Sequence, residues 1–374
     1  MPSNGATQEG TRQFRDNRQK NFHPDKLREI AGLSVSALGL GTYLGGYDDA
    51  TDAASEESIR EAISLGLNFL DTAINYRCQR SERTIGRALK GLIESKKLKR
   101  SQVVVATKGG FIPFDGTPPS NLKAYIKNTW IDTGLVSEED IVASCHCLHP
   151  AYIQHQIQAS LSNLGLDTID IYYLHNPETQ LPVLGHDAFY LRLAKAFEVL
   201  EKNVAEGKIQ FYGLATWTAF REPAGAENIS LERVVKTARE VAGEGHHFKV
   251  IQLPYNLAML EAISVHGQRV GERNLPIIPA ASEMGISVVT SAPLLQSQLL
   301  NLPVALVEKI PGDFTLAQKA LQFVVSTPSV QACMVGMNRK EHGTENLNIL
   351  KAPNWDLPTL QKICDVLVRG RGNS

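Results

Sequence analysis

Cysteine is scarce in this chain of 374 residues, and the five cysteines are scattered: Cys78, Cys145, Cys147, Cys333 and Cys364. An odd, dispersed set does not resemble the disulfide framework of a small secreted protein, so we expect a reducing, cytoplasmic location. Net charge is also scarce, because 38 basic residues face 39 acidic ones. The sequence therefore offers no basic footprint for nucleic acid or an anionic membrane, and a small-molecule partner fits better.

Long apolar stretches are lacking too, since no run approaches the roughly 20 residues of a membrane-crossing helix. The stretch from Met1 to about Lys20 is polar and lacks the apolar core of a signal peptide. We expect residues 1–26 to form a disordered or extended tail. Hydrophobic residues nevertheless make up 43% of the chain, which is ordinary for a globular protein with a large core.

The sequence does contain a regular alternation of short apolar, β-branched runs and longer stretches with helical spacing. The predicted strands are Ala37–Thr42, Asn68–Asp71, Val103–Thr107, Ile169–His175, Ile209–Ala215, Val250–Leu253, Ser287–Thr290 and Ala332–Gly336. The predicted helices are Ser55–Leu65, Glu82–Ser95, Tyr152–Leu164, Ala188–Glu206, Leu231–Ala242, Pro276–Met284, Leu316–Ser326 and Lys340–Leu350. Such units predict a parallel α/β sheet closed into a (β/α)8 TIM barrel over residues 27–352.

A doubly wound open sheet is the alternative that the alternation alone leaves open. The glycine-rich segment Leu40–Gly46 lacks the GxGxxG spacing of the dinucleotide-binding turn, which favours the barrel. Residues 109–150 form a long insertion after the third strand, and residues 353–374 are predicted to be a C-terminal helix and tail. The insertion would be a lid or specificity element over the barrel mouth, or a surface excursion or oligomer contact.

Polar residues stand at or just after the ends of predicted strands that should be apolar: Asp71, Tyr76, Lys108 and His175. All of them would lie at the mouth, where barrel enzymes place their chemistry. Carbonyl reduction needs a proton at oxygen, which Tyr76 would supply if the Lys108 ammonium, held by Asp71, lowered its pKa. His175 would orient the carbonyl oxygen. Each residue alone also has a purely structural interpretation, as a buried ion pair or a rim histidine.

Around these residues the sequence resembles the aldo-keto reductase superfamily. Asn68–Tyr76, followed by Ser81-Glu82 and Gly86, is similar to the family signature DTAxxYGxxxSExxLG, and Leu161–His175 is similar to SLxxLGxDxIDxxxLH. The likeness runs from about Leu27 to Leu350. It implies an NAD(P)(H)-dependent oxidoreductase that interconverts an aldehyde, ketone or sugar carbonyl with an alcohol, without a metal. The alternative function is a nicotinamide-binding regulatory or accessory subunit with little turnover.

The resemblance also implies that Asp71, Tyr76, Lys108 and His175 are catalytic and that the cofactor lies extended across the barrel mouth. The residues implied to hold the cofactor are Gly41, Thr42, Asp71, Thr216, Gln252, Leu294, Gln296, Ser297, Asn338, Arg339, His342, Glu345 and Asn346. Because a guanidinium suits a 2′-phosphate, Arg339 favours NADP(H) over NAD(H); a solvated arginine is the alternative.

The chain departs from the family pattern at several positions. Arg77 stands where many members have glycine, and would place a cation near the substrate or point to solvent. Ala215-Thr216 replaces Ser-Asn, and Ser291 replaces an aromatic residue, which weakens the expected grip on the cofactor. Further aromatic residues would shape a substrate pocket or simply pack: Tyr43, Phe111, Trp130 and Trp217. The substrate, the direction and the oligomeric state do not follow from the sequence.

Cysteine and histidine occur together in Cys145-His146-Cys147, and both are zinc ligands. The spacing fits no standard finger, so we expect no metal site there. Cys78 is close to Tyr76 in the sequence and would be either redox-sensitive or inert.

Overall fold

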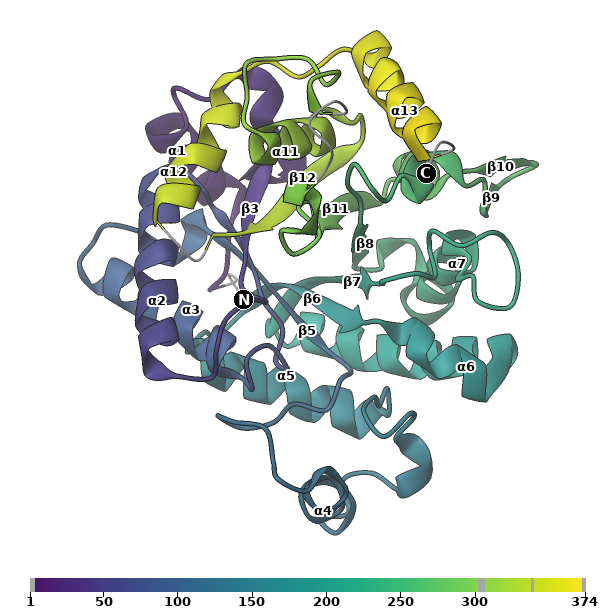
Figure 1. Ribbon diagram of the computed structural model, residues 1–374. Helices are drawn as coiled ribbons and strands as arrows, with labels where there is room; N and C mark the ends of the chain where they lie inside the picture. The colour runs from purple at the N-terminus through teal and green to yellow at the C-terminus, as the bar shows by residue number, and fades with distance from the viewer. Residues whose placement is uncertain (1–3, 302–306, 338–339, 372–374) are drawn as a thin grey trace.

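The computed structural model describes residues 4–301, 307–337 and 340–371. Its centre is a closed barrel of parallel strands in the order β11-β12-β3-β4-β5-β6-β7-β8 (Figure 1). The barrel strands are β3 (Leu38–Gly41), β4 (Phe69–Asp71), β5 (Val104–Gly109), β6 (Ile169–His175), β7 (Ile209–Ala215), β8 (Phe248–Pro254), β11 (Ser287–Ser291) and β12 (Val330–Gly336). Every one of them coincides with a predicted strand, and the predicted barrel is confirmed.

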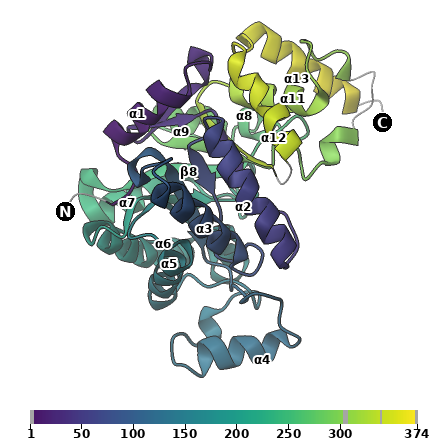
Figure 2. The ribbon, with the colours of Figure 1, turned by 90° about the vertical axis from the view of Figure 1, so that its left-hand side faces the viewer.

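Helices surround the barrel, as Figures 1 and 2 show from two directions. They include α2 (Asp49–Ser64), α3 (Arg80–Glu94), α5 (Pro150–Leu164), α6 (Leu181–Ala205), α7 (Leu231–Ala242), α9 (Ile277–Glu283), α11 (Leu316–Ser326) and α12 (Lys340–Leu347). Local signals set their ends: Asp48 caps α2 by accepting a hydrogen bond from Thr51 N at 2.8 Å, and α5 ends at Gly165 with a left-handed φ of 62°.

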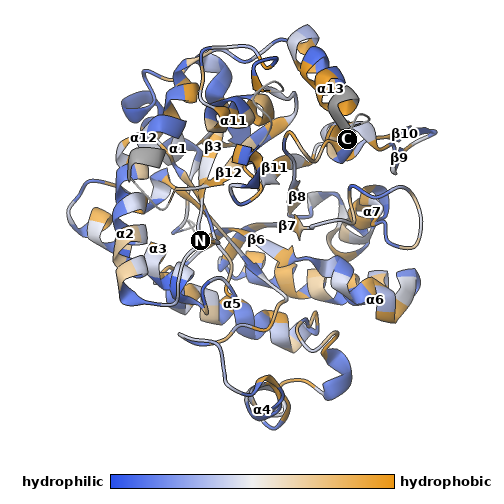
Figure 3. Ribbon diagram, in the orientation of Figure 1, coloured by the Kyte–Doolittle hydropathy of each residue, from blue (hydrophilic) through white to orange (hydrophobic). Residues whose placement is uncertain are grey.

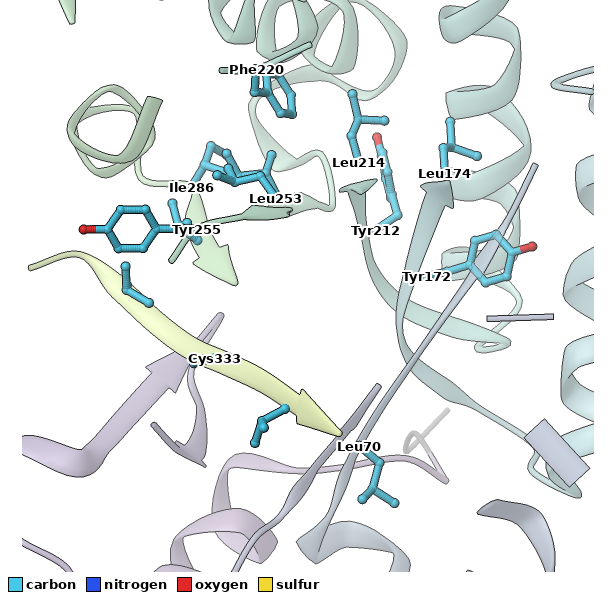
Figure 4. Close-up of a cluster of buried hydrophobic side chains, with 14 of the residues drawn as sticks. Leu70, Tyr172, Leu174, Tyr212, Leu214, Phe220, Leu253, Tyr255, Ile286 and Cys333 are labelled. Carbon is cyan, nitrogen blue, oxygen red and sulfur yellow. The ribbon is translucent and has the colours of Figure 1, made fainter. Parts of the chain in front are cut away.

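The core has two layers, because successive side chains of a strand point to opposite faces. On β6, Ile171 and Tyr173 point into the barrel, whereas Tyr172 and Leu174 point outward to the helices. Figure 4 shows part of the outer layer, including Tyr172 and Leu174. The helices meet this layer with their apolar sides, and Figure 3 shows hydrophobic and hydrophilic colours together along α2, α3, α5, α6 and α7.

The amino-terminal segment is folded, so the prediction of a disordered or extended tail over residues 1–26 is wrong for the part that the structure describes. Helix α1 (Gln8–Arg18) begins after Thr7, whose side chain accepts a hydrogen bond from Gly10 N at 2.9 Å, and Phe14 is buried. Ala6 N donates to the buried Asp170 carboxylate at 2.7 Å. These contacts anchor the segment to the base of the barrel.

A hairpin that was not predicted also covers this end of the barrel. It consists of β1 (Leu27–Ile30) and β2 (Leu33–Ser36), and it contributes Ile30, Leu33 and Val35 to the interior layer. A second hairpin, β9 (Gln268–Val270) with β10 (Arg273–Leu275), precedes α9, and α13 (Leu357–Arg371) lies in the expected carboxyl-terminal region. None of the described helices is both long and apolar enough to cross a membrane.

Candidate active site

A cavity of about 490 Å³ lies at the carboxyl ends of the barrel strands. Its described lining residues are Gly41, Thr42, Tyr43, Leu44, Asp71, Asn75, Tyr76, Phe111, His175, Asn176, Ala215, Thr216, Trp217, Gln252, Ser291, Ala292, Pro293, Leu294, Gln296, Ser297, Met334, Val335 and Gly336. The set includes three of the four predicted catalytic residues and all the predicted cofactor residues that precede the eighth barrel strand, β12. Lys108, the fourth residue predicted to be catalytic, is buried behind them.

Lys108 and Asp71 form a buried ion pair, with Lys108 Nζ 2.5 Å from Asp71 Oδ1. The ammonium also donates to Thr72 O at 2.8 Å, and Gln252 Nε2 donates to Asp71 Oδ2 at 2.9 Å. Burial lowers the pKa of Lys108, while Asp71 acts against that change. Asp71 therefore holds the lysine in place, as the sequence predicts.

Tyr76 lies over this ion pair, and Lys108 Nζ is 4.9 Å from the centre of its ring. The predicted direction of its pKa is wrong: burial, together with Asp71 and Tyr43, raises the pKa of Tyr76 well above its usual value. The ammonium is directed to Asp71 and Thr72, so it does not offset the loss of solvation of a phenolate. Tyr76 is consequently a neutral phenol, the form that can donate a proton.

His175 stands beside Tyr76, with ring centres 5.7 Å apart. Burial, with additional repulsion from Lys108 and His146, lowers the pKa of His175 well below its usual value. Its imidazole is therefore neutral and suited to hydrogen bonding rather than to carrying charge. Phe111 packs edge-on against it at 5.0 Å.

The two ends of the insertion, Gly110–Phe111 and His146, pair with each other and contact His175, and we call them the stem of the insertion. His146 and Phe111 form an antiparallel bridge, and their rings pack edge-on at 5.0 Å. His146 Nε2 donates to His175 O at 2.7 Å, because a carbonyl oxygen can only accept, and Gln180 Nε2 donates to His146 Nδ1 at 3.0 Å. Burial lowers the pKa of His146 to about 4, so this ring is neutral as well. Gly110 is needed here, since a Cβ would lie only 2.8 Å from His146 Nε2.

The aldo/keto reductase family matches residues 37–363 of the chain. The chain belongs to this family. It is 32% identical over 188 residues to the NADH-specific methylglyoxal reductase of Escherichia coli (strain K12), a match that covers 49% of each chain. It is 25% identical over 279 residues to probable aldo-keto reductase 1 of Glycine max, covering 74% of this chain and 60% of the relative. The matches thus span about half to three fifths of these relatives.

Solved structures of the family have the same fold. The holo form of an aldo-keto reductase from Bacillus halodurans has a TM-score of 0.63 and 22% identity, and the alignment covers 91% of this chain and 96% of that one. An aldo/keto reductase from Klebsiella pneumoniae in complex with NADP and acetate has a TM-score of 0.62 and 21% identity, with coverage of 91% and 95%.

Arg77 departs from the family pattern, and the structure places its side chain in neither of the two positions that we expected, beside the substrate or in solvent. It neither lines the cavity nor points to solvent: its side chain is 2% exposed, its Nη2 is 2.5 Å from Asp52 Oδ1, and its Nε donates to Gly46 O at 2.8 Å. Arg77, Cys78 and Gln79 have successive positive φ values of 49°, 55° and 70°. The ion pair with α2 stabilises this strained turn, which directly follows Tyr76.

Two tryptophans predicted as substrate residues have different positions. Trp130 is wrong as a pocket residue, because it is 5% exposed and its ring packs against Tyr152 of α5 at 5.0 Å, away from the cavity lining. Trp217 does line the cavity and is 42% exposed. Its backbone is held on both sides, since Glu178 Oε1 accepts from Trp217 N at 2.6 Å and Arg221 Nη2 donates to Trp217 O at 2.8 Å.

The residues predicted to hold the adenosine end are only partly described. Asn338 and Arg339 lie outside the described residues, as does the side chain of His342. Glu345 and Asn346 lie on α12, outside the cavity lining, and Glu345 O accepts a hydrogen bond from Gln318 Nε2 at 2.7 Å. Their assignment to the cofactor stays a prediction.

Sequence reasoning missed three polar residues of the site: Asn75, Asn176 and His146. A signal existed for the first two, since each is adjacent in sequence to a predicted catalytic residue. No such signal marks His146, whose contact with His175 spans 29 positions. Among the described residues, no group of three His, Cys, Asp or Glu side chains could hold a metal ion.

Proposed function

We propose that this chain is an NAD(P)(H)-dependent oxidoreductase that interconverts a carbonyl and an alcohol, with Tyr76 as proton donor or acceptor. One observation carries the proposal: a neutral phenol, a neutral imidazole and a buried lysine–carboxylate pair from separate strand ends converge on one cavity. The family match supports the same activity.

The cavity suits a nicotinamide cofactor. Thr216 Oγ1 is buried in its wall without a hydrogen-bond partner in the described structure, and Gln252 presents its carboxamide beside Asp71. These groups would hold the nicotinamide amide, and Leu294, Gln296 and Ser297 would line the pyrophosphate path. When bound, the cofactor supplies a hydride to the carbonyl carbon.

The protein side chains supply the proton. His175 would orient the carbonyl oxygen by hydrogen bonding from its neutral imidazole, and Tyr76 would donate its phenolic proton to that oxygen. Lys108 Nζ, 4.9 Å from the ring centre, would be the positive charge beside the tyrosinate left behind, and Asp71 raises the pKa of this lysine against the effect of burial. In the oxidative direction the same tyrosinate would accept the proton.

We further propose NADP(H) as the preferred form of the cofactor, from the suitability of Arg339 for a 2′-phosphate. The Klebsiella structure contains NADP, whereas the Escherichia coli relative is named NADH-specific. Titration with NADPH and NADH decides the matter: NADPH should bind more tightly, and Arg339→Gln should remove most of the difference. Equal affinities in the unaltered protein would refute the preference.

The test of the proposed function is Tyr76→Phe, assayed against a panel of aldehydes and ketones that includes methylglyoxal. Turnover should fall by about 100-fold or more, the scale of acid–base catalysis, while the cofactor Kd measured from tryptophan fluorescence stays within a factor of three or so. Tyr47→Phe is the matched control, because Tyr47 is exposed and lies outside the cavity lining. Surviving turnover in Tyr76→Phe would exclude Tyr76 as the donor. Tight cofactor binding without turnover by the unaltered protein would favour the accessory-subunit alternative.

A further inference from the structure

The turn after Tyr76 carries a buried arginine whose side chain reaches two other elements. Arg77 Nη2 is 2.5 Å from Asp52 Oδ1 on α2. Its Nε donates at 2.8 Å to Gly46 O, which lies in the loop between β3 and α2. One guanidinium therefore joins the turn to both this loop and the helix that follows the loop.

The loop between β3 and α2 is attached to the same region at a second point. Ser81 Oγ, near the start of α3, donates to Thr42 O at 2.8 Å. Between Thr42 and Gly46 lies Tyr43, whose ring packs edge-on against that of Tyr76 with ring centres 5.0 Å apart. The loop segment is thus fastened at both ends, and it presents the ring of Tyr43 to the proposed proton donor.

The loop fits closely around the arginine. A Cβ added at Gly45 would lie 3.1 Å from Arg77 Nε and 2.8 Å from Thr51 Cγ2, and the φ of Gly45 is 135°, a conformation that favours glycine. A glycine at position 77, which many family members have, would make neither the ion pair nor the hydrogen bond to Gly46 O. The attachment through Arg77 is therefore a feature of this chain and not of the family pattern.

Resting on the proposed function, we propose that Arg77 is a positioning residue for Tyr76. Its hydrogen bond to Gly46 O fixes the loop against the turn, and the loop in turn holds the ring of Tyr43 against that of Tyr76. The phenol then stands between Tyr43 and His175, whose ring centre is 5.7 Å away. Arg77 is absent from the described lining of the cavity, so it acts through these neighbours and not on the substrate.

The test is Arg77→Lys, because lysine has a methylene group where arginine has Nε. The variant keeps a positive charge for Asp52 but loses the donor to Gly46 O. We expect kcat to fall about 10- to 100-fold, the scale of a displacement on the order of 1 Å at a reacting group, while the cofactor Kd changes by less than about threefold. Arg77→Gly, which suits the φ of 49° at this position, should show the same loss of kcat.

Arg87→Lys is the matched control. Arg87 Nη2 lies 3.4 Å from the same Asp52 carboxylate, and the other contacts of its side chain in the described structure are with Glu56 and Thr84, on α2 and α3. This variant should keep the kcat of the unaltered protein. Urea unfolding of every variant shows whether it is folded under the assay conditions, so that kcat refers to folded protein.

The outcomes separate positioning from stability. A lower urea midpoint in the Arg77 variants with unaltered kcat would show that the contact only stabilises the fold, and would overturn the proposal. An unaltered kcat in Arg77→Lys, a loss confined to the cofactor Kd, or an equal loss of kcat in Arg87→Lys would overturn it as well. If the unaltered protein reduces no carbonyl, the proposed function itself fails; if it does and both Arg77 variants turn over normally, only this inference fails.

Discussion

Lys26 is a buried lysine whose hydrogen-bond partners among the described residues include no carboxylate, and its replacement should change how stability depends on pH. Its side chain is fully buried, and Nζ donates to Gln322 Oε1 at 3.0 Å and to Asn354 Oδ1 at 2.6 Å. Burial, followed by repulsion from Arg28, lowers the pKa of Lys26 to about 7, against a smaller opposing effect of Asp25.

The direction of the pH dependence of stability follows from the number of protons that the folded and unfolded states bind. In the unfolded chain the same amine has a pKa of 10.5, so between about pH 7 and 10.5 the unfolded state binds more protons than the folded state. The penalty of burying this lysine is complete below pH 7 and disappears as the pH rises toward 10.5. At about 1.36 kcal/mol per pH unit the whole penalty is about 5 kcal/mol, and about 3 kcal/mol of it is relieved between pH 6 and pH 9.

The assay is urea unfolding of the unaltered chain and of Lys26→Met at pH 6 and pH 9, followed by tryptophan fluorescence. The unaltered chain should gain about 3 kcal/mol of unfolding free energy over the variant between the two pH values. The acceptors of Gln322 and Asn354 that methionine leaves unpaired add a cost that is the same at both, so it cancels. Lys362→Met, at an exposed lysine of α13, should show no such change. A difference that stays constant within about 0.5 kcal/mol would refute the reasoning.

Two further substitutions test the site and the barrel. His146→Phe keeps a ring but removes the donor to His175 O. We expect kcat/KM to fall about tenfold, the effect of roughly 1.4 kcal/mol, while the NADPH Kd is preserved. Because the pKa of His146 is about 4, this loss should be the same from pH 6 to 9. Unaltered kinetics would show that the stem does not position His175. Gly213→Ala would drive a Cβ into Val250 O of the adjacent strand and should lower the unfolding free energy by about 2–4 kcal/mol. Gly225→Ala, where the nearest atom is 3.9 Å away, is its control, and equal urea midpoints would contradict the clash.

The barrel strands were predictable because each is a short, largely buried run with apolar residues, and such a run is visible in the local composition of the sequence. Ile169–His175 and Ile209–Ala215 are found with the predicted bounds. Helix α1 was not predictable in the same way, because its residues are mostly polar and its stability comes from docking Phe14 and Ala6 against the barrel. Such tertiary contacts leave little trace in a local pattern.

The residues of the candidate site likewise divide into those whose position follows from the sequence and those whose position depends on tertiary contacts. Asp71, Lys108 and His175 stand at strand ends, so their meeting follows from barrel topology alone. The position of Arg77 depends instead on Asp52, a partner 25 residues away on α2, and no spacing rule connects them. The raised pKa of Tyr76 comes first from burial and then from Asp71 and Tyr43, and the burial of this side chain depends on tertiary packing that a local sequence pattern does not record.

The insertion divides into parts with different freedom to diverge. Its stem, Gly110–Phe111 against His146, contacts the wall of the cavity, whereas α4 (Leu122–Ile126) stands out beyond α5 in both views (Figures 1 and 2). Loop grafting between relatives could therefore exchange the tip around α4 without disturbing the reacting centre, provided that the contact of Trp130 with α5 is kept. Transplanting the stem as well would also transfer the residues that contact His175 from one enzyme to another. The stem and the tip around α4 are therefore parts of the insertion that can be exchanged separately, in engineering and in evolution.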